Sequence, residues 1–379
     1  MAIPAPYRTL PITRTRFPHL HPTWLLLTVG LVLLAAACGG SSKKPEPTPI
    51  QDQAGVTATP LPEPTAVPPP IRVAPLTGEV ISEEHFLALE GQRPLAVMID
   101  NIAAATPQAG LDQADVVIEA LVEGGVTRFM AVFHSKAPAV IEPVRSARTP
   151  FLYWAAEYDA LYAHVGSAEL DGPADAGRQI HEWGIHDLDL GTQPFDYSYV
   201  RDPNRLAPHN VLIDASKLRQ RAVELGREGP PALVSWRFTV PEGLLPGVPA
   251  LRFSVQFGPF SPRFSVQWDW DASVQRYLRS QFGEPQHDAA SGNRLAFANV
   301  IIQYANAYLA DGNGHVLIDV VGEGPAQVYS NGQLVEGTWR KTGLRERTEF
   351  LGPDGAPIPL LAGPTWIEVV QPSGRSTVF

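Results

Sequence analysis

Cys38 is the only cysteine in this 379-residue chain, and it limits how the chain can fold more than any other feature. The residues after it have no thiol with which to form an internal disulfide, so they must be held together by an apolar core. They are numerous enough to bury such a core, and their number favours two domains over one.

An export signal is the interpretation that best fits the residues before Cys38. Arg8, Arg14 and Arg16 precede a mostly apolar run at residues 24–37, and no acidic residue occurs before Cys38. The run is 14 residues long, whereas a membrane-spanning helix needs about 20. A basic start, a short apolar stretch and small residues at its end are typical of a secretory signal.

The residues around Cys38 resemble the lipobox of bacterial lipoproteins. The segment Leu34-Ala35-Ala36-Ala37-Cys38 carries the resemblance, although Ala35 stands where the pattern usually has leucine. The resemblance implies that Cys38 becomes the lipidated first residue of an extracytoplasmic protein and anchors it to the cell membrane. An ordinary cleaved signal followed by an incidental cysteine is the alternative.

Residues 38–78 are predicted to form an extended spacer between the anchor and the folded body. Ten prolines lie between Pro45 and Pro75, and no aromatic residue occurs among them. A proline-rich chain without large apolar side chains cannot bury a core and adopts extended, semi-rigid conformations. At about 3 Å per residue, the spacer reaches up to roughly 100 Å from the membrane.

The charge of the body argues against nucleic acid as a partner. Removing the three leader arginines from the 29 basic residues leaves 26 against 39 acidic ones, a formal charge of −13. Such an acidic body is a poor electrostatic match for nucleic acid or for anionic lipid. We therefore expect contact with the membrane through the lipid on Cys38 alone.

Residues 79–237 are predicted to form an α/β (α+β) N-terminal domain with a mixed sheet. Apolar or alternating runs predict strands at residues 94–100, 115–123, 127–134 and 160–165. Helices are expected at residues 150–158, 174–183 and 215–225, the last of them after Asp214, a good N-cap. The alternation of strands and helices favours a sheet covered by helices.

Residues 251–379 are predicted to form a mostly antiparallel β domain, connected to the first by residues 238–250. Asp311-Gly312, Asn331-Gly332 and Asp354-Gly355 separate its short β-rich runs and favour tight hairpin turns. Trp339 and Trp366 supply large apolar side chains in this domain. An exposed patch that contains them would favour a structural adaptor that docks a partner protein.

Asp115, Glu119 and Glu123 form the first candidate cluster for function. In a strand the three carboxylates share one face, and a helix would also bring them to one side. Carboxylates so placed can bind a cation, pair with arginines, or serve as general acid and base. A solvated sheet face or a structural ion-pair network is the alternative.

The second candidate cluster is cationic and comprises Arg128, Arg145, Ser146 and Arg148. Thr149 is expected to cap a helix whose first residue is Pro150. Two guanidinium groups would then lie beside a helix N-terminus, which favours anions, and guanidinium forks bind phosphate or carboxylate with paired hydrogen bonds. Alternatively, these arginines only neutralise nearby carboxylates such as Glu119, Glu123 or Glu142.

His164 ends a predicted strand and His209-Asn210 begins another, and ligand sites of α/β sheets often lie at strand ends, so these residues are further candidates. A purely structural role for each residue is the alternative. The histidines of the segment at residues 181–186 are five positions apart, which is about 140° around a helix, so this is not a zinc-protease motif. The sequence predicts no metal site, no cofactor and no catalytic cysteine in the exported body, and it assigns no catalytic residue.

Several blocks of the chain resemble the YerB-like lipoproteins, a bacterial family classed under a domain of unknown function. They are residues 93–101, 113–117, 122–128 and 143–148 in the first domain and residues 337–339 and 365–367 in the second. The resemblance implies an N-terminal α/β domain and a separate C-terminal domain, and it implies no established activity. Thr106 stands where the family has arginine, which weakens a full arginine cluster, and Glu142 and Ser167 stand where it has glycine.

Three functions remain open. The first is the binding of an anionic small molecule or envelope glycan in a groove of the first domain. The second is an envelope hydrolase or phosphotransferase, with Glu119 or Glu123 as acid or base and with Arg145 and Arg148 as phosphate ligands. The third is the adaptor. The candidate ligand-binding residues are Asp100, Asn101, Glu119, Glu123, Arg128, Arg145, Ser146, Arg148, His164, His209 and Asn210.

Overall fold

The computed structural model describes residues 70–379 apart from 169–171, 192–198 and 260. The predicted export signal, Cys38 and most of the proline-rich spacer therefore lie outside the described residues. Within the described ranges, no helix combines the length and the apolarity needed to cross a bilayer. Residues 67–379 form one compact unit with a core of its own.

The folded body begins before residue 79, the start predicted from the sequence. Strand β1 (Arg72–Val73) pairs with β2 (Val80–Ile81), and the side chains of Ala74, Leu76 and Thr77 are buried. The start could not be recognised from the proline pattern, because Pro75 lies in the turn between the two strands and looks like a continuation of the proline-rich spacer. The predicted end of the spacer at residue 78 is thus a few residues too late.

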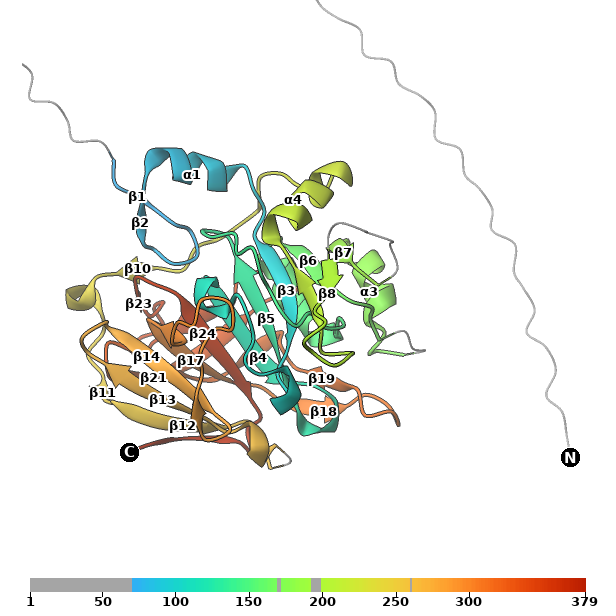
Figure 1. Cartoon of the computed structure of the whole chain (residues 1–379). Helices are drawn as coiled ribbons and strands as arrows, with labels where there is room; N and C mark the ends of the chain where they lie inside the picture. The colour runs from blue at the N-terminus through green and yellow to red at the C-terminus, as the bar shows by residue number, and fades with distance from the viewer. Residues whose placement is uncertain (1–69, 169–171, 192–198, 260) are drawn as a thin grey trace, which may run out of the picture. The chain divides into compact units, whose positions relative to one another are not determined.

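One large mixed sheet runs through the described body (Figure 1). Its strands follow the order β11-β21-β20-β17-β24-β4-β5-β3-β6-β7, and β22 pairs with β21 at the side. The first half of the chain supplies β3 (Leu95–Asp100), β4 (Val116–Leu121), β5 (Thr127–Phe133), β6 (Leu161–His164) and β7 (His186–Asp189). The second half supplies β11 (Val248–Pro249), β17 (Asn299–Tyr304), β20 (Gly322–Ser330), β21 (Gln333–Lys341), β22 (Glu349–Leu351) and β24 (Thr365–Val370).

The two halves of the chain meet inside this sheet. Strand β24 of the second half pairs in parallel with β4 of the first, and Glu368 lies directly opposite Glu119. Both faces of β4 are buried, because its odd-numbered and even-numbered apolar residues belong to different core clusters. The halves predicted as separate domains are therefore joined by continuous backbone hydrogen bonding.

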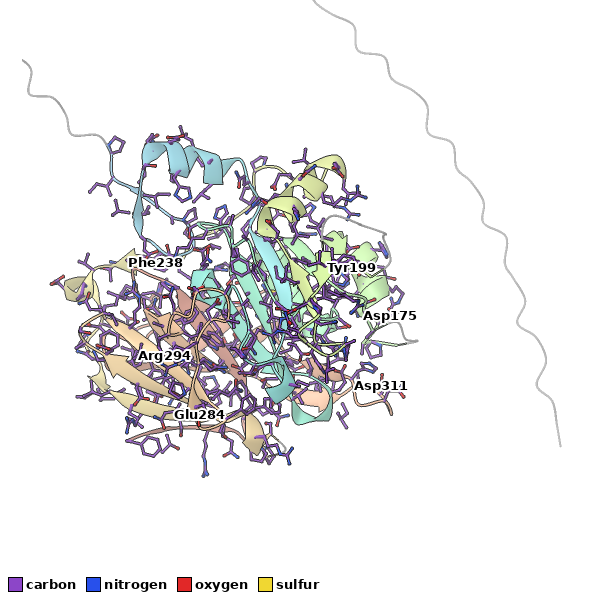
Figure 2. All side chains as sticks on the ribbon, in the orientation of Figure 1. Asp175, Tyr199, Phe238, Glu284, Arg294 and Asp311 are labelled. Atoms are coloured by element: carbon purple, nitrogen blue, oxygen red, sulfur yellow. The ribbon has the colours of Figure 1, made fainter. Side chains whose placement is uncertain are left out.

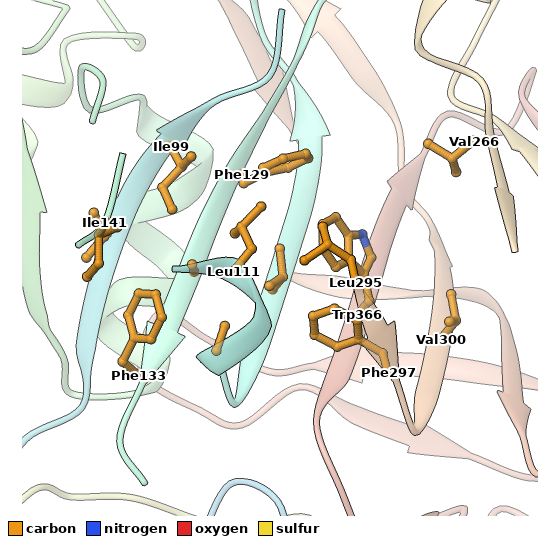
Figure 3. Close-up of a cluster of buried hydrophobic side chains, with 14 of the residues drawn as sticks. Ile99, Leu111, Phe129, Phe133, Ile141, Val266, Leu295, Phe297, Val300 and Trp366 are labelled. Atoms are coloured by element: carbon orange, nitrogen blue, oxygen red, sulfur yellow. The ribbon is translucent and has the colours of Figure 1, made fainter. Parts of the chain in front are cut away.

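A second, antiparallel sheet covers one face of the large sheet. Its strand order is β15-β14-β13-β12-β25, with β16 pairing with β14. The bounds are β12 (Arg252–Gln256), β13 (Val266–Asp271), β14 (Arg276–Gln281), β15 (Glu284–Pro285), β16 (Ala296–Phe297) and β25 (Arg375–Val378). Figure 3 shows the apolar cluster around Phe129, Phe297 and Trp366. The predicted fold class, a mixed α/β sheet followed by mostly antiparallel strands, is confirmed.

Helices cover both faces of the large sheet in the first half of the chain. They are α1 (Glu83–Glu90), α2 (Thr149–Glu157), α3 (Ala176–Glu182) and α4 (Ala215–Glu224). The last three confirm the predicted helices, and Asp214 caps α4 by accepting a hydrogen bond from the Ser216 amide. Helix α1 was not predicted. The N-cap of α2 is Arg148 rather than Thr149, because Thr149 already has helical geometry and its hydroxyl binds Gln179.

The remaining elements are short. The strands are β8 (Tyr199–Arg201), β9 (Val211–Ile213), β10 (Phe238–Thr239), β18 (Ala307–Leu309), β19 (Val316–Ile318) and β23 (Leu360–Leu361). Five 3-10 turns also occur in the described residues: Ala103–Ala105, Leu111–Gln113, Glu123–Gly125, Pro241–Gly243 and Pro262–Phe264. Asn331 and Gly332, both with positive φ, form the predicted tight turn between β20 and β21.

Candidate functional site

The carboxyl ends of four strands meet at one edge of the large sheet. Strands β3, β4, β6 and β7 run in the same direction, and β5 runs in the opposite direction between β4 and β3. Asp100 ends β3, His164 ends β6, and Arg128 lies at the start of β5, directly opposite Asp100. The end of an open α/β sheet where parallel strands finish is the usual place for a ligand.

The segment before helix α2 crosses this edge and brings two further arginines to it. Arg145 donates its backbone N–H to Met98 of β3, and Ala147 donates its own to Gly166, which follows β6. Arg148 then occupies the N-cap position of α2, so the positive end of the helix dipole lies at the same edge. We call the group of Arg128, Arg145 and Arg148, with Asp100 and Glu123, the arginine edge.

Arg128 is the buried member of the arginine edge. Its side chain is 5% exposed, and one guanidinium nitrogen, Nη1, donates a hydrogen bond of 2.9 Å to the backbone carbonyl of Ser146. Among the described residues, its buried Nε has no hydrogen-bond partner, and no carboxylate lies within ion-pairing distance of the guanidinium. Burial and the neighbouring charge of Arg148 lower the pKa of Arg128 to about 10.

Arg145 and Arg148 are each paired with one carboxylate but remain partly open to solvent. Arg145 Nε lies 3.1 Å from Asp100 Oδ2, and Arg148 Nε binds the Glu123 carboxylate. Their side chains are 23% and 17% exposed. Among the described residues, two carboxylates therefore pair with two of the three guanidinium groups: Arg148 with Glu123, one of the carboxylates considered from the sequence, and Arg145 with Asp100, which was not. Glu142 pairs instead with Arg205, 3.3 Å away.

His209 joins the arginine edge through Asp100. Its Nδ1 lies 2.5 Å from Asp100 Oδ2, so the nitrogen donates to the carboxylate and leaves Nε2 without a partner among the described residues. The ring is partly exposed, with 18% of its side chain accessible. Asn210 next to it is buried and accepts a hydrogen bond from Arg201, which gives it a structural contact rather than a place at the edge.

His164 is buried beside the arginine edge and holds the ends of β6 and β7 together. Nδ1 lies 2.8 Å from the carbonyl of Gly166, and Nε2 lies 2.8 Å from the Asp187 carboxylate. Both ring nitrogens therefore face oxygen atoms that can accept a hydrogen bond. Tyr162 packs against this ring, and its buried hydroxyl has no partner among the described residues.

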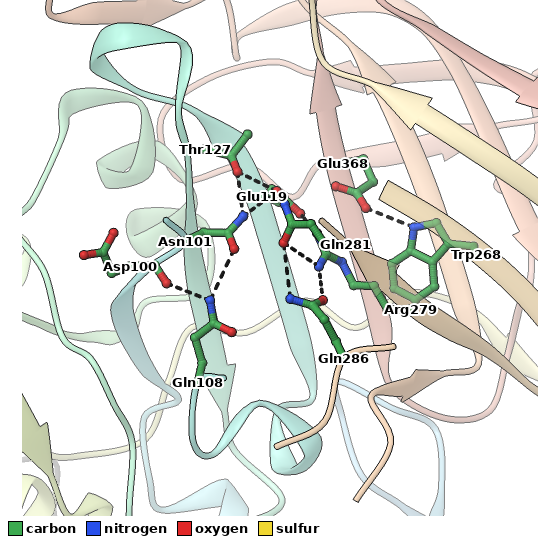
Figure 4. A network of polar contacts seen from close by, with 10 residues as sticks. All are labelled: Asp100, Asn101, Gln108, Glu119, Thr127, Trp268, Arg279, Gln281, Gln286 and Glu368. Carbon is green, nitrogen blue, oxygen red and sulfur yellow. Dashed lines mark hydrogen bonds and ion pairs between the residues drawn. The ribbon is translucent and has the colours of Figure 1, made fainter. Parts of the chain in front are cut away.

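Asn101 and Glu119 lie in a closed network inside the protein, and not in an open groove (Figure 4). Asn101 Nδ2 donates to Glu119 Oε1 and to Thr127, and Gln108 donates to Asn101. Arg279 of the antiparallel sheet lies 2.5 Å from Glu119 Oε2, and neither side chain has any exposed surface. Glu119 thus fits the predicted structural ion-pair network.

Glu368 completes this network and was missed by sequence reasoning. Trp268 donates its indole N–H to one oxygen of Glu368, while the other oxygen is buried without a hydrogen-bond partner among the described residues. Burial and the neighbouring charge of Glu119 raise the pKa of Glu368 well above its ordinary value. Asp115, the third carboxylate of the predicted cluster, binds the amides of His134 and Ser135 instead.

The aromatic residues proposed for docking are also inside the protein. Trp366 is fully buried and Trp339 is 2% exposed. Trp366 contacts Phe129, Trp268 and Phe297, and Trp339 donates its indole N–H to the carbonyl of Tyr304. These two rings cannot form an exposed adaptor surface.

Two family matches cover most of the described body. Residues 76–228 match the N-terminal domain of the DUF3048 proteins of unknown function, and residues 255–367 match the C-terminal domain of the same family. A curated relative, the putative lipoprotein YerB of Bacillus subtilis (strain 168), is 30% identical over 304 residues, which are 78% of this chain and 86% of the relative. The chain belongs to the DUF3048 family.

A solved structure agrees with this assignment. The crystal structure of the YerB protein from Bacillus subtilis matches with a TM-score of 0.70 and 26% sequence identity, covering 81% of this chain and 99% of that one. Both halves of the DUF3048 fold are therefore present here. The arginine edge lies within the residues matched to the N-terminal domain, whereas Arg279 and Glu368 belong to the second half of the chain.

Proposed function

We propose that this protein, as a lipid-anchored extracytoplasmic lipoprotein, binds the anionic group of a small molecule or envelope glycan at the arginine edge. The single observation that carries the proposal is Arg128, a buried arginine without a carboxylate partner among the described residues. The lipobox around Cys38 and the printed name of the Bacillus subtilis relative support the lipoprotein part.

A buried cation without a counter-ion is costly. Taking a charged group out of water costs several kcal/mol, and a nearby carboxylate usually offsets this cost. Here burial and the charges of Arg148 and Arg145 lower the pKa of Arg128, and they outweigh Asp100 and Glu123, which favour its ionised form. A bound anion would remove this cost, so the arrangement favours a ligand that brings a negative charge.

Phosphate and carboxylate are the groups that fit best. Guanidinium groups bind both with paired hydrogen bonds, and the positive end of the α2 dipole adds to the attraction. Arg145 and Arg148 are partly exposed, so they can exchange one hydrogen bond to their carboxylates for one to a ligand. Inorganic phosphate is therefore a suitable first probe.

The test measures thermal unfolding of the 67–379 unit with rising phosphate at constant ionic strength, using chloride as the reference salt. A specific site stabilises the protein by about 2.7 kcal/mol at a ligand concentration of one hundred times Kd. Arg128→Met should abolish this gain while leaving the protein without ligand equally stable or more stable, since it removes an unpaired buried charge.

Arg340→Met is the matched control, because Arg340 of β21 is exposed and paired with Glu349 of β22. It should leave the phosphate response unchanged. Two results would overturn the proposal. One is the absence of any phosphate or carboxylate effect on the wild type, and the other is an unchanged phosphate response in Arg128→Met.

Hydrolysis or transfer of a phosphate group is the second candidate, favoured by the pair of Asp100 and His209. A carboxylate that orients an imidazole, with the other ring nitrogen free, is a common acid–base arrangement. Glu119 has no exposed surface, so it suits this role poorly. Release of phosphate from a simple phosphomonoester by the wild type, lost in His209→Asn, would support this candidate; no release by the wild type would reject it.

A further inference from the structure

An apolar pocket of about 530 Å³ opens next to the arginine edge. This volume lies in the range of pockets that hold small organic ligands. The pocket lies between the end of β4, the turn at Glu123–Gly125 and the hairpin of β18 and β19, whose tip carries Asp311 (Figure 2). Its lining includes Leu121, Val122, Ala307, Tyr308, Leu309 and Val316.

Two side chains, those of Glu123 and His315, lie where the pocket adjoins the arginine edge. Val122 and Gly124 line the pocket, and Glu123 between them turns its carboxylate to Arg148. The opposite wall repeats this arrangement, because Gly314 and Val316 line the pocket while His315 between them lies 3.6 Å from the same carboxylate. A molecule that passes Glu123 can therefore touch both regions.

The mouth of the pocket is open and apolar. Gly124 and Gly314 both have positive φ, and a Cβ atom at either position would meet nothing within 4 Å. Leu309 and Tyr308 of β18 are 69% and 52% exposed. Exposed apolar side chains at the rim of a pocket are typical of a binding surface, and here they adjoin a cationic group.

We propose that the ligand is an anionic amphiphile, whose charged group binds at the arginine edge and whose hydrocarbon chain occupies this pocket. This inference rests on the proposed function and names the class of ligand. Charge complementarity supports this occupant: the pocket walls are mostly apolar and suit a hydrocarbon chain, while the adjoining arginine edge contains Arg128, whose Nε has no hydrogen-bond partner among the described residues. A purely polar glycan would leave the apolar walls unused.

The test compares dissociation constants of inorganic phosphate, methyl phosphate, octyl phosphate and octyl glucoside for the 67–379 unit, each below its micelle concentration. Each buried methylene adds to affinity, so octyl phosphate should bind at least tenfold more tightly than methyl phosphate. Octyl glucoside carries the same chain without the charge and should bind at least tenfold more weakly than octyl phosphate.

Two variants test whether the hydrocarbon chain of octyl phosphate occupies this pocket. Ala307→Phe should fill the pocket, and Leu309→Gln should make its rim polar; both should reduce the preference for octyl over methyl phosphate to less than threefold. Neither should change binding of inorganic phosphate. Val274→Gln is the matched control, because Val274 is 54% exposed in the turn between β13 and β14, away from the pocket lining.

The outcomes separate this inference from the proposed function. If phosphate and methyl phosphate fail to bind, the proposed function fails. If they bind but octyl phosphate gains nothing, or if its gain survives in both variants, the amphiphile inference alone is overturned. Equal binding of octyl glucoside and octyl phosphate would also overturn it, because the chain would then bind without the arginine edge.

Discussion

Glu119 and Glu368 lie directly opposite each other on the parallel strands β4 and β24, and both are fully buried where the two halves of the chain meet. Glu119 binds Arg279, while Glu368 keeps one oxygen without a hydrogen-bond partner among the described residues. Burial and the neighbouring charge of Glu119 raise the pKa of Glu368 well above its ordinary value, which favours the protonated form of Glu368.

Glu368→Gln should leave the protein as stable as the wild type near neutral pH, or more stable, because an amide resembles the protonated acid. Burial and Glu119 raise the pKa of Glu368, so the folded state keeps a proton that the unfolded state loses above about pH 4.3. The stability that this group contributes is therefore present below that pH and is lost as the pH rises toward the folded-state pKa.

Urea unfolding between pH 4 and pH 9 measures this effect. The difference in unfolding free energy between Glu368→Gln and the wild type should grow in favour of the variant as the pH rises. Glu284→Gln, in the exposed strand β15, is the control and should show no such trend. A difference that is constant with pH would mean that Glu368 is ionised in the folded protein.

Arg279→Met should destabilise the protein by about 3–5 kcal/mol, since it leaves the Glu119 carboxylate buried and unpaired. The guanidinium also packs 4.4 Å from the centre of the Trp366 ring, a contact that methionine only partly replaces. The double variant Arg279→Met with Glu119→Gln should recover part of this loss, because no unpaired charge remains. Equal unfolding midpoints of the single and double variants would rule out this explanation. Arg252→Met, on the exposed pair with Asp269, should cost less than about 1 kcal/mol.

Local sequence signals predicted most of the elements in the first half of the chain. Apolar runs marked β3, β4, β5 and β6, and the cap at Asp214 marked the start of α4. Helix α1 was missed because only Leu89 of this helix is buried. A helix with so little buried surface leaves a weak periodic pattern.

The site was harder to predict because its partners are distant in the sequence. The sequence correctly predicted a strand at Glu119. Its partner Arg279, however, is 160 positions away, and the residues around Glu119 give no signal of that contact. Asp187 could have been suspected, because Asp187 and Asp189 alternate along a short segment and so share one face. Among the described residues, Arg128 has no carboxylate partner while Arg145 and Arg148 each have one, and this difference depends on the fold alone.

Glu157→Gln should destabilise the protein, and the loss of stability should vary with pH in the opposite direction to the effect expected for Glu368→Gln. Glu157, at the end of α2, is buried and binds both Lys341 of β21 and Arg347. Burial opposes its ionisation, but these two cations outweigh burial and hold the pKa of Glu157 below its ordinary value. The contribution of Glu157 is therefore present above about pH 4.3 and is lost as the pH falls through the folded-state pKa.

The cost of Glu157→Gln should be about 3–5 kcal/mol at pH 7, since two buried cations lose their partner, and it should shrink toward pH 3. Chemical unfolding at these two pH values gives the comparison. Glu182→Gln breaks an exposed pair with Arg178 on α3 and should cost less than about 1 kcal/mol at either pH. A cost for Glu157→Gln that is equal at pH 7 and pH 3 would show that its charge does not matter.

Cys38→Ala should move the protein from the membrane fraction to the surrounding fluid, or leave it as an unprocessed precursor, because the proposed lipid is attached to this thiol. Metabolic labelling with a fatty acid should mark the wild type and not the variant. Ala37→Gly, which keeps a small residue before the cysteine, is the control and should still be labelled. A wild type that is cleaved but carries no label would support the alternative of an ordinary secretory signal with an incidental cysteine.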